Sequence, residues 1–202
     1  MIEGQPTTED VLRIVSDIVL PLAALDRTMV MPSDKNRHEN VAEHSYMLGT
    51  VACALAGRLD ETLDVGLVAQ FALVHDIVEV HAGDTTVWAS PAELADKQRR
   101  EEESLRKISN DHQAFPWITR TIETYEKLDT PESRYVYALD KMLAHMLIIV
   151  GDYHPVRPTW EAYLKTEETA RGKIALYPLL SPYFEDLCQT FRGKPHFFQP
   201  KA

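Results

Sequence analysis

Residues 71–84 read FALVHDIVEVHAGD, an apolar helical pattern interrupted by two adjacent polar side chains, His75 and Asp76. Both residue types bind divalent metal ions, and neither is expected in a buried helix face without a partner. Glu79 follows His75 by four residues and shares its helical face, whereas Asp76 is rotated from His75 by about 100°. All three side chains can border one cavity, which predicts a metal site in this part of the chain.

Two further polar residues interrupt apolar helical patterns: His44 in NVAEHSYML and Asp140 in YVYALDKML. Burial of an ionised carboxylate such as Asp140 costs several kcal/mol unless a positive charge neutralises it. A divalent cation would neutralise it, and so would a salt bridge to Lys141 or Arg134. His44 taken alone also fits a hydrogen-bonded core histidine. Together with the pair at 75 and 76, these residues make four groups that can share one cation.

The periodicity of the whole chain predicts an all-α fold. Apolar residues recur at spacings of three and four, and the sequence lacks alternating strand patterns and Asn-Gly hairpin turns. We expect helices over residues 11–25, 41–57, 63–80, 117–128, 133–151, 160–175 and 183–192, and a further helix that starts at residue 91 and carries the charged run 96–107. Pro21 is expected to kink or break the end of the first helix. Residues 26–40 are expected to form a polar connector, and the tail from residue 194 to be irregular.

Local signals mark where several of these helices begin and end. Thr7 or Thr8 can cap the first helix, and Asn40 can cap the helix that carries His44. Ser90 is followed by proline and then by glutamate three residues after the cap, which is a strong start signal. The charged run at 96–107, DKQRREEESLRK, is typical of an exposed helix face with internal ion pairs.

Length and charge limit the classes of function. A chain of 202 residues with 45% hydrophobic content fits a single domain spanning 1–202, with its core at about 10–175 and a C-terminal helix and tail at 176–202. The net charge of -10 argues against nucleic-acid polymers and membrane surfaces as partners. The first ten residues lack the pattern of a signal peptide, so we expect a cytoplasmic protein. Cys53 and Cys188 are expected to be buried, reduced thiols.

The order of the polar residues resembles that of a known family. The segments ENVAEHSYML at 39–48, ALVHDIVEVHAGDT at 72–85 and ALDKM at 138–142 carry the resemblance. In them the chain is similar to the HD-domain metal-dependent phosphohydrolases, and more closely to their small nucleotidase branch, the 5'-deoxynucleotidases. The resemblance covers roughly residues 10–175, and the HDxxE pattern followed by AGD is its most specific part. It implies a single HD-type helical bundle.

The resemblance also implies roles for individual residues. By it, the ligands of a divalent metal are His44, His75, Asp76 and Asp140. Glu79 would be the catalytic acid or base, and the substrate would contact Arg27, Asp84 and Thr85. Mixed nitrogen and oxygen ligands suit Mn, Co, Fe, Zn or Ni. A homodimer is the assembly implied, with the aromatic residues of the tail as a candidate interface.

One departure from the family pattern concerns the substrate. In the nucleotidases, the arginine that corresponds to Arg27 is followed in sequence by a tryptophan that shapes the nucleotide pocket. This chain has Thr28 at that position. The resemblance therefore specifies the type of reaction more closely than the substrate. The connector after Thr28 also looks long, and Arg37 or His38 is an alternative source of a phosphate contact.

These patterns favour hydrolysis of the phosphomonoester of a nucleoside 5'-monophosphate, with a small nucleotide as the binding partner. A phosphodiesterase or nucleoside triphosphohydrolase of the same superfamily is the nearest enzymatic alternative. A non-catalytic helical module that senses a nucleotide or a metal is the alternative from another class; the presence of every expected ligand and of Glu79 argues against it. A HExxH zinc protease is disfavoured because the spacing here is HDxxE.

Overall fold

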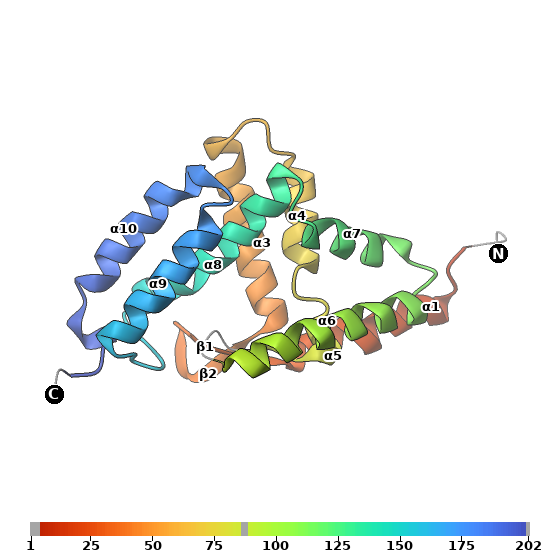
Figure 1. Ribbon diagram of the computed structural model, residues 1–202. Helices are drawn as coiled ribbons and strands as arrows, with labels where there is room; N and C mark the ends of the chain where they lie inside the picture. Colours follow the sequence, from red (N-terminus) through yellow and green to blue (C-terminus); the bar gives the residue numbers. More distant parts are fainter. Residues whose placement is uncertain (1–4, 86–88, 201–202) are drawn as a thin grey trace.

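The computed structural model describes residues 5–85 and 89–200, and this part of the protein is built mainly of α-helices (Figure 1). The elements of the first part of the chain are α1 (Thr8–Ile14), a π-helical segment (Val15–Val19), α2 (Leu20–Ala24), β1 (Asp26–Met31), β2 (Asp34–Asn40), α3 (Val41–Leu59), α4 (Val65–Val74) and α5 (Glu79–Ala82). Those of the second part are α6 (Pro91–Asp111), α7 (Pro116–Glu126), α8 (Pro131–Gly151), α9 (Trp160–Ile174), a 3-10 turn (Pro178–Leu180), α10 (Ser181–Arg192) and a second 3-10 turn (Pro195–Phe197). The predicted all-α class is confirmed.

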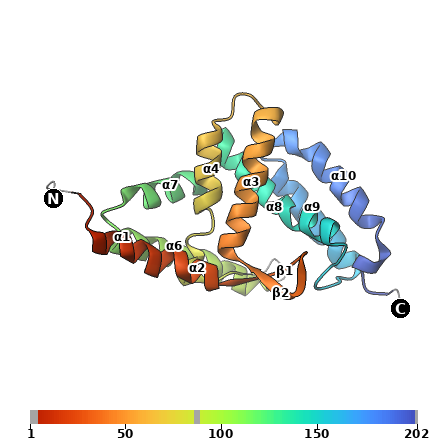
Figure 2. The ribbon, with the colours of Figure 1, turned by 180° about the vertical axis from the view of Figure 1, so that it is seen from behind.

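The helices form two groups on either side of a central pair (Figures 1 and 2). The central pair is α3 and α4, which pack on each other and on α8. On one side, α8, α9 and α10 contact one another, while on the other side α1, α2 and α6 run along the same edge of the molecule. The first core cluster lies where α3, α4 and α8 meet, with Leu48, Phe71 and Leu139 fully buried. The predicted metal ligands lie on α3 and α8 and in the segment directly after α4.

The polar connector predicted at 26–40 is wrong, because this segment forms the antiparallel hairpin of β1 and β2. Its register pairs Asp26 with Asn40, Val30 with His38 and Met31 with Asp34, with irregularities between these pairs. The strands are largely polar and their turn is not of the Asn-Gly type, so the usual hairpin signals are missing. The hairpin ends directly at α3.

The continuous helix predicted at 63–80 is also wrong, because the α-helix ends at Val74 and resumes at Glu79. Between them the backbone tightens, as the N–H of Ile77 bonds to the carbonyl of Val74 and the N–H of Glu79 to that of Asp76. These bonds span three residues instead of four, as in a 3-10 helix. His75 and Asp76 therefore lie in a break between two helices.

Other boundaries follow the predicted signals. Thr7, Asn40 and Ser90 each cap a helix in a reciprocal capping box, and Gly83 ends α5 with a positive φ. Pro21 does not end the first helix. The π-helical segment directly before α2 widens the backbone where the proline lacks an N–H and would crowd the preceding turn.

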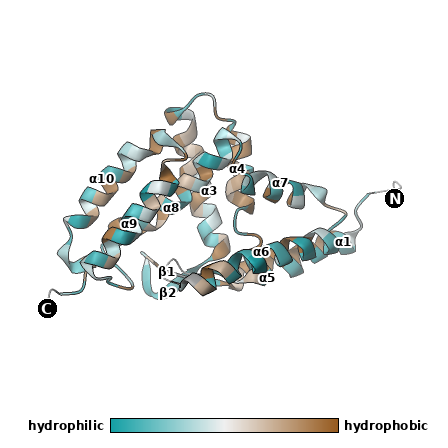
Figure 3. Cartoon of the chain, viewed as in Figure 1, coloured by the Kyte–Doolittle hydropathy of each residue, from teal (hydrophilic) through white to brown (hydrophobic). Residues whose placement is uncertain are grey.

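The charged run at 96–107 lies on α6, whose hydrophilic surface is visible in Figure 3. Ion pairs such as Arg99 with Asp96 and Glu103 cover its exposed face, as predicted. By contrast, the tail contradicts the prediction of an aromatic interface. Phe197 and Phe198 are buried in a cluster with Phe191 and neighbouring residues of the same chain.

One segment of the described ranges, Val65–Ala82, is long and apolar enough to cross a membrane by length and composition, and half of it is buried inside the protein. A buried core helix meets the same criterion. This segment includes His75, Asp76 and Glu79, which would be expensive to place in lipid. We therefore describe it as part of the core.

Candidate metal centre

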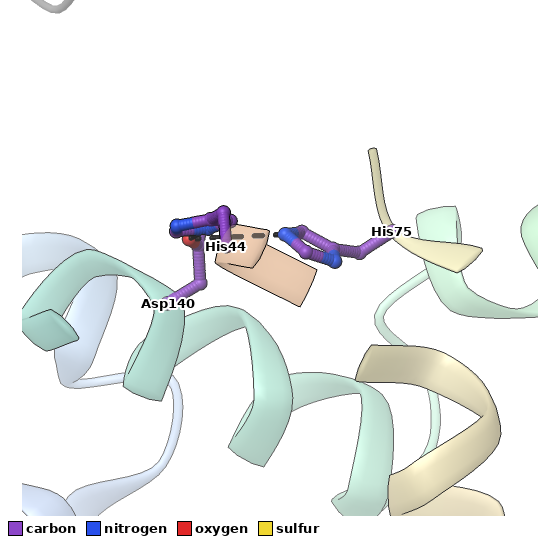
Figure 4. A group of neighbouring side chains, drawn as sticks. All are labelled: His44, His75 and Asp140. Carbon is purple, nitrogen blue, oxygen red and sulfur yellow. Dashed lines mark hydrogen bonds and ion pairs between the residues drawn. The ribbon is translucent and has the colours of Figure 1, made fainter. Parts of the chain in front are cut away.

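Three of the predicted ligands converge from α3, from α8 and from the turn that follows α4 (Figure 4). His44 lies in the second turn of α3, His75 follows the last residue of α4, and Asp140 lies in the middle of α8. One ligand atom from each residue lies within 4.8 Å of those from the other two. His44, His75 and Asp140 can therefore hold a divalent metal ion between α3, α4 and α8.

The surroundings of His75 prepare it to bind a cation. Its Nδ1 lies 2.9 Å from the carbonyl oxygen of Ala72, which can only accept, so Nδ1 carries the proton. The nitrogen left to bind a cation is then Nε2, which is buried, forms no aligned hydrogen bond and lies 3.1 Å from Oδ2 of Asp76. A metal ion is a partner that such a nitrogen fits. Residues 75–78, where α4 breaks, thus bring a ligand atom into the centre.

His44 lies between two buried carboxylates. Its Nε2 donates to Oδ1 of Asp140 at 2.9 Å, and its Nδ1 lies 3.2 Å from Oε1 of Glu39. Burial opposes a charge on the ring, but the neighbouring carboxylates of Asp140 and Glu39 raise the pKa of His44 to about 9. The environment of the ring therefore favours a positive charge, which is the requirement of a cation site.

Asp140 has both of the partners considered from the sequence. Burial opposes its ionisation, but the Lys141 ammonium at 2.6 Å and the hydrogen bond from His44 hold the pKa of Asp140 well below its usual value. The predicted salt bridge to Lys141 and the predicted place beside His44 therefore occur together. The carboxylate remains ionised and available as an oxygen ligand.

Asp76 lies at the edge of this group. Its Oδ2 is 3.1 Å from Nε2 of His75 and 3.9 Å from Nε2 of His44, and it accepts a hydrogen bond of 2.6 Å from Nη1 of Arg27. Burial opposes ionisation of Asp76, but the neighbouring His75 and Arg27 lower its pKa. Its place as a fourth ligand remains a prediction that the short distance to His75 supports.

Glu79 is buried beside the centre, with Oε2 lacking a hydrogen-bond partner. Its carboxyl group lies 3.6 Å from Nη1 of Arg27 and 3.9 Å from Nζ of Lys97. Burial and the negative charge of Asp76 raise the pKa of Glu79 to about 9. At neutral pH this group carries a proton, as suits a general acid.

Arg27 reaches the centre from the hairpin, at an irregular part of the register between Asp26 and Val30. Its side chain is 19% exposed, with Nη1 bonded to Asp76 and Nε 3.2 Å from Oε1 of Glu39. Burial opposes its charge, yet the surrounding carboxylates raise the pKa of Arg27 above its usual value. By contrast, Arg37 pairs with the partly exposed Glu43, and the side chain of His38 is exposed.

The other two predicted substrate contacts follow α5. Asp84 and Thr85 are partly buried, and the hydroxyl of Thr85 accepts a hydrogen bond of 2.9 Å from Nη2 of Arg100 on α6. Arg100 also donates to the carbonyl of Ala82. The structure thus fixes the start of this loop on α6, while contact with a substrate remains a prediction.

Three residues near the centre were missed from the sequence: Glu39, Lys97 and Arg100. Lys97 and Arg100 belong to the charged run at 96–107, which the sequence predicts to be an exposed helix face. Their spacing of three places them on one face of the helix, which was the available signal. Glu39 lies within the predicted polar connector at 26–40, and nothing in its local pattern marks it as buried.

The fold and site define a class of mainly helical proteins that hold a divalent metal ion between helices. Comparison with known families makes this more specific. The HD domain family matches residues 22–181. Because the match spans most of the chain, the protein belongs to the HD domain family.

Two solved structures share the fold. A predicted metal-dependent phosphohydrolase from Magnetospirillum magnetotacticum MS-1 is 25% identical, with a TM-score of 0.75 and 95% of each chain covered. The PH0347 protein of Pyrococcus horikoshii OT3 is 20% identical, with a TM-score of 0.62 and coverage of 91% of this chain and 99% of its own. No curated protein matches the chain in sequence.

Proposed function

We propose that this protein is a metal-dependent phosphohydrolase that converts nucleoside 5'-monophosphates, including deoxynucleotides, to nucleoside and phosphate. The observation that carries the proposal is the group of His44, His75 and Asp140, with a protonated buried carboxyl group and a guanidinium directly beside it. Membership of the HD domain family and the similarity to the Magnetospirillum protein support the reaction class.

The proposed metal ligands are His44, His75, Asp76 and Asp140. Their mixed nitrogen and oxygen donors suit Mn, Co, Fe, Zn or Ni. When bound, such an ion would polarise the phosphoryl group and lower the pKa of water. Asp76 would join the ligands through its carboxylate, whose Oδ2 lies 3.1 Å from Nε2 of His75.

The side chains around the metal would bind the phosphate and move a proton. Arg27 presents a guanidinium that can bind phosphate oxygens in place of a carboxylate. Glu79, protonated at neutral pH, would donate its proton to the leaving 5'-oxygen and so avoid an alkoxide. Asp84 and Thr85, held next to α6 by Arg100, are the proposed contacts to the rest of the substrate.

Turnover measurements test this function. Protein stripped of metal would be supplied with each of the five ions and a panel of ribonucleoside and deoxynucleoside monophosphates, and released phosphate measured. We expect metal-dependent release that Asp76→Ala abolishes and that Glu79→Gln lowers by about 100-fold or more. Glu103→Gln, which removes an exposed carboxylate that pairs with Arg99, is the matched control and keeps activity. Release no greater than that of Asp76→Ala would refute the proposal.

Product analysis separates the alternatives. Pyrophosphate or triphosphate from nucleoside triphosphates would indicate a triphosphohydrolase, and cleavage of cyclic or linear diesters a phosphodiesterase. Binding of metal and nucleotide without any product would indicate a sensing module. Each of these results would replace monoester hydrolysis as the function.

The proposed setting is the cytoplasm, with one domain over residues 1–202 and no nucleic-acid polymer or membrane as partner. The net charge of -10 supports the last point, because it repels polyanions. The proposed assembly is a homodimer. Its support is a stripe of exposed apolar residues on the first helical segment, Val11, Leu12, Val15, Val19 and Leu20. Sedimentation of the purified protein would measure its oligomeric state.

A further inference from the structure

Glu39 is a buried carboxylate in contact with two functional side chains. It is the next-to-last residue of β2 and is 2% exposed. A single oxygen, Oε1, lies 3.2 Å from Nδ1 of His44 and 3.2 Å from Nε of Arg27. The other oxygen, Oε2, is buried without a hydrogen-bond partner, and the contact of Oε1 with Nδ1 of His44 is an ion-pair distance, not an aligned hydrogen bond. Both contacts of the side chain therefore converge on one atom.

We propose that Glu39 is a positioning residue that orients His44 toward the metal and Arg27 toward the phosphate. The inference rests on the proposed function, because it assigns a role within the same site. A histidine that binds a cation through Nε2 must carry its proton on Nδ1, and a carboxylate beside Nδ1 fixes both the tautomer and the ring plane. Glu39 supplies this carboxylate to His44. The backbone carbonyl of Ala72 does the same for His75, because it accepts a hydrogen bond from Nδ1.

The contact with Arg27 gives Glu39 a second role. Arg27 is held by Asp76 at Nη1 and by Glu39 at Nε. Asp76 is a proposed metal ligand, so its hold on the guanidinium would weaken when it binds a cation. Glu39 would still hold the inner edge of Arg27 and leave its terminal nitrogens directed at a phosphate. One carboxylate thus serves both metal binding and substrate binding.

A purely structural role makes a different prediction. If Glu39 only balanced the charges of His44 and Arg27, its removal would destabilise the fold without a selective effect on metal affinity. The position of Oε1 also distinguishes two substitutions. Glu39→Gln keeps an oxygen acceptor that can meet both partners, whereas Glu39→Ala removes it. The amide variant should therefore retain part of the function.

The test compares metal affinity and kinetics in wild type, Glu39→Ala, Glu39→Gln and the control Glu103→Gln, whose carboxylate is exposed. Titration of stripped protein with Mn²⁺ alone should show affinity roughly 10- to 100-fold weaker for Glu39→Ala, with a smaller loss for Glu39→Gln. At saturating Mn²⁺, KM for the nucleotide should rise in Glu39→Ala more than kcat falls, because Arg27 is less well placed. The control should match wild type, and circular dichroism should verify that each variant is folded.

The outcomes separate the inference from the proposed function. Suppose that the wild-type protein binds Mn²⁺ and releases phosphate, and that a folded Glu39→Ala variant binds Mn²⁺ with unchanged affinity. This result would overturn the proposed role of Glu39 and leave the proposed function standing. A Glu39→Ala protein that does not fold leaves Glu39→Gln as the decisive variant, and unchanged Mn²⁺ affinity and KM in it would overturn the inference. Wild-type protein that neither binds Mn²⁺ nor releases phosphate would overturn the proposed function first.

Discussion

At the scale of single residues, the site is a small region of concentrated charge. The guanidinium of Arg27 lies within 3.6 Å of three buried or largely buried carboxyl groups, those of Glu39, Asp76 and Glu79. Partners of opposite charge make such burial tolerable, and removal of one partner leaves the others uncompensated. The stability of the protein should therefore depend on Arg27 most strongly when no cation shares the compensation.

We predict that Arg27→Ala lowers the free energy of unfolding by about 3 kcal/mol in metal-stripped protein. The loss should be smaller at saturating Mn²⁺, because the cation neutralises part of the same charge. Urea denaturation with and without the metal measures both values. Arg99→Ala is the control, since its pairs with Asp96 and Glu103 are exposed and should contribute less than about 1 kcal/mol. Equal, small losses in both variants would contradict this account.

The identities of the metal-competent residues could be predicted because a buried charge stands out in an apolar pattern, as Asp140 does. The polar contacts that surround these residues could not be predicted from the sequence. Glu39 is buried only because the hairpin brings it against α3 and Arg27, and no local pattern records such long-range proximity. Residue chemistry therefore predicted the centre, while its surrounding polar contacts required the fold.

At the scale of elements, the break after α4 is the feature that periodicity could not reveal. Apolar residues spaced by three or four fit α-helical and 3-10 backbone equally, so residues 63–80 look like one helix. The switch to three-residue hydrogen bonds at Ile77 and Glu79 is visible only in the backbone. Similarly, the polar strands of the hairpin lack the alternation that marks half-buried strands. Capping signals succeeded at Asn40 and Ser90 because capping is local chemistry.

The end of α5 yields a prediction at this scale. Gly83 has φ of 74° and ψ of 153°, a region that essentially only glycine adopts. An added Cβ would have room, as its nearest neighbour is 4.0 Å away on Arg100, so the penalty comes from the backbone. Gly83→Ala should lower the free energy of unfolding by about 1–3 kcal/mol. It should also raise KM, because Asp84 and Thr85 follow directly.

Gly57→Ala is the matched control for this change. Gly57 lies within α3, and a Cβ there meets no atom within 4 Å. Alanine should therefore stabilise the helix by up to about 1 kcal/mol and leave KM unchanged. Urea denaturation and nucleotide kinetics on both variants provide the comparison. A Gly83→Ala protein as stable and active as Gly57→Ala would show that this backbone conformation is not required.

At the scale of the whole molecule, the C-terminal segment packs through aromatic contacts that the sequence did not predict. The ring of His145 lies 5.3–6.3 Å from those of Phe184, Phe191 and Tyr163, and its Nδ1 is buried without a partner. The tail adds Phe197 to this cluster. Aromatic residues in a short polar tail are compatible with either exposure or burial, and the choice depends on a surface formed by distant helices.

This packing predicts loss of stability in acid. Burial lowers the pKa of His145 to about 4, below the ordinary value of 6.5. The unfolded chain therefore takes up a proton first, and the stability present above pH 6.5 falls as the pH drops toward 4. By pH 5 this residue should remove about 2 kcal/mol. His145→Phe keeps the aromatic contacts without the titration, so its free energy of unfolding should depend less on pH.

Urea denaturation at pH 7 and pH 5 measures the difference. His38→Gln, which changes an exposed side chain, should show the same acid dependence as wild type. An equally steep loss of stability in His145→Phe and wild type would assign the acid sensitivity to other groups. The next group to test would be His154, because burial also lowers its pKa to about 4.

Of the three helices that meet at the candidate metal centre, α3 and α4 follow one another in the chain, whereas α8 lies beyond α5, α6 and α7. A cation bound to His44, His75 and Asp140 would act as a non-covalent cross-link. It would close two segments of the chain, residues 44–75 and residues 75–140. The entropy of closing a loop grows only slowly with its length. Changes of surface charge on the exposed face of α6, within the segment 75–140, should therefore leave the positions of the three ligands unchanged.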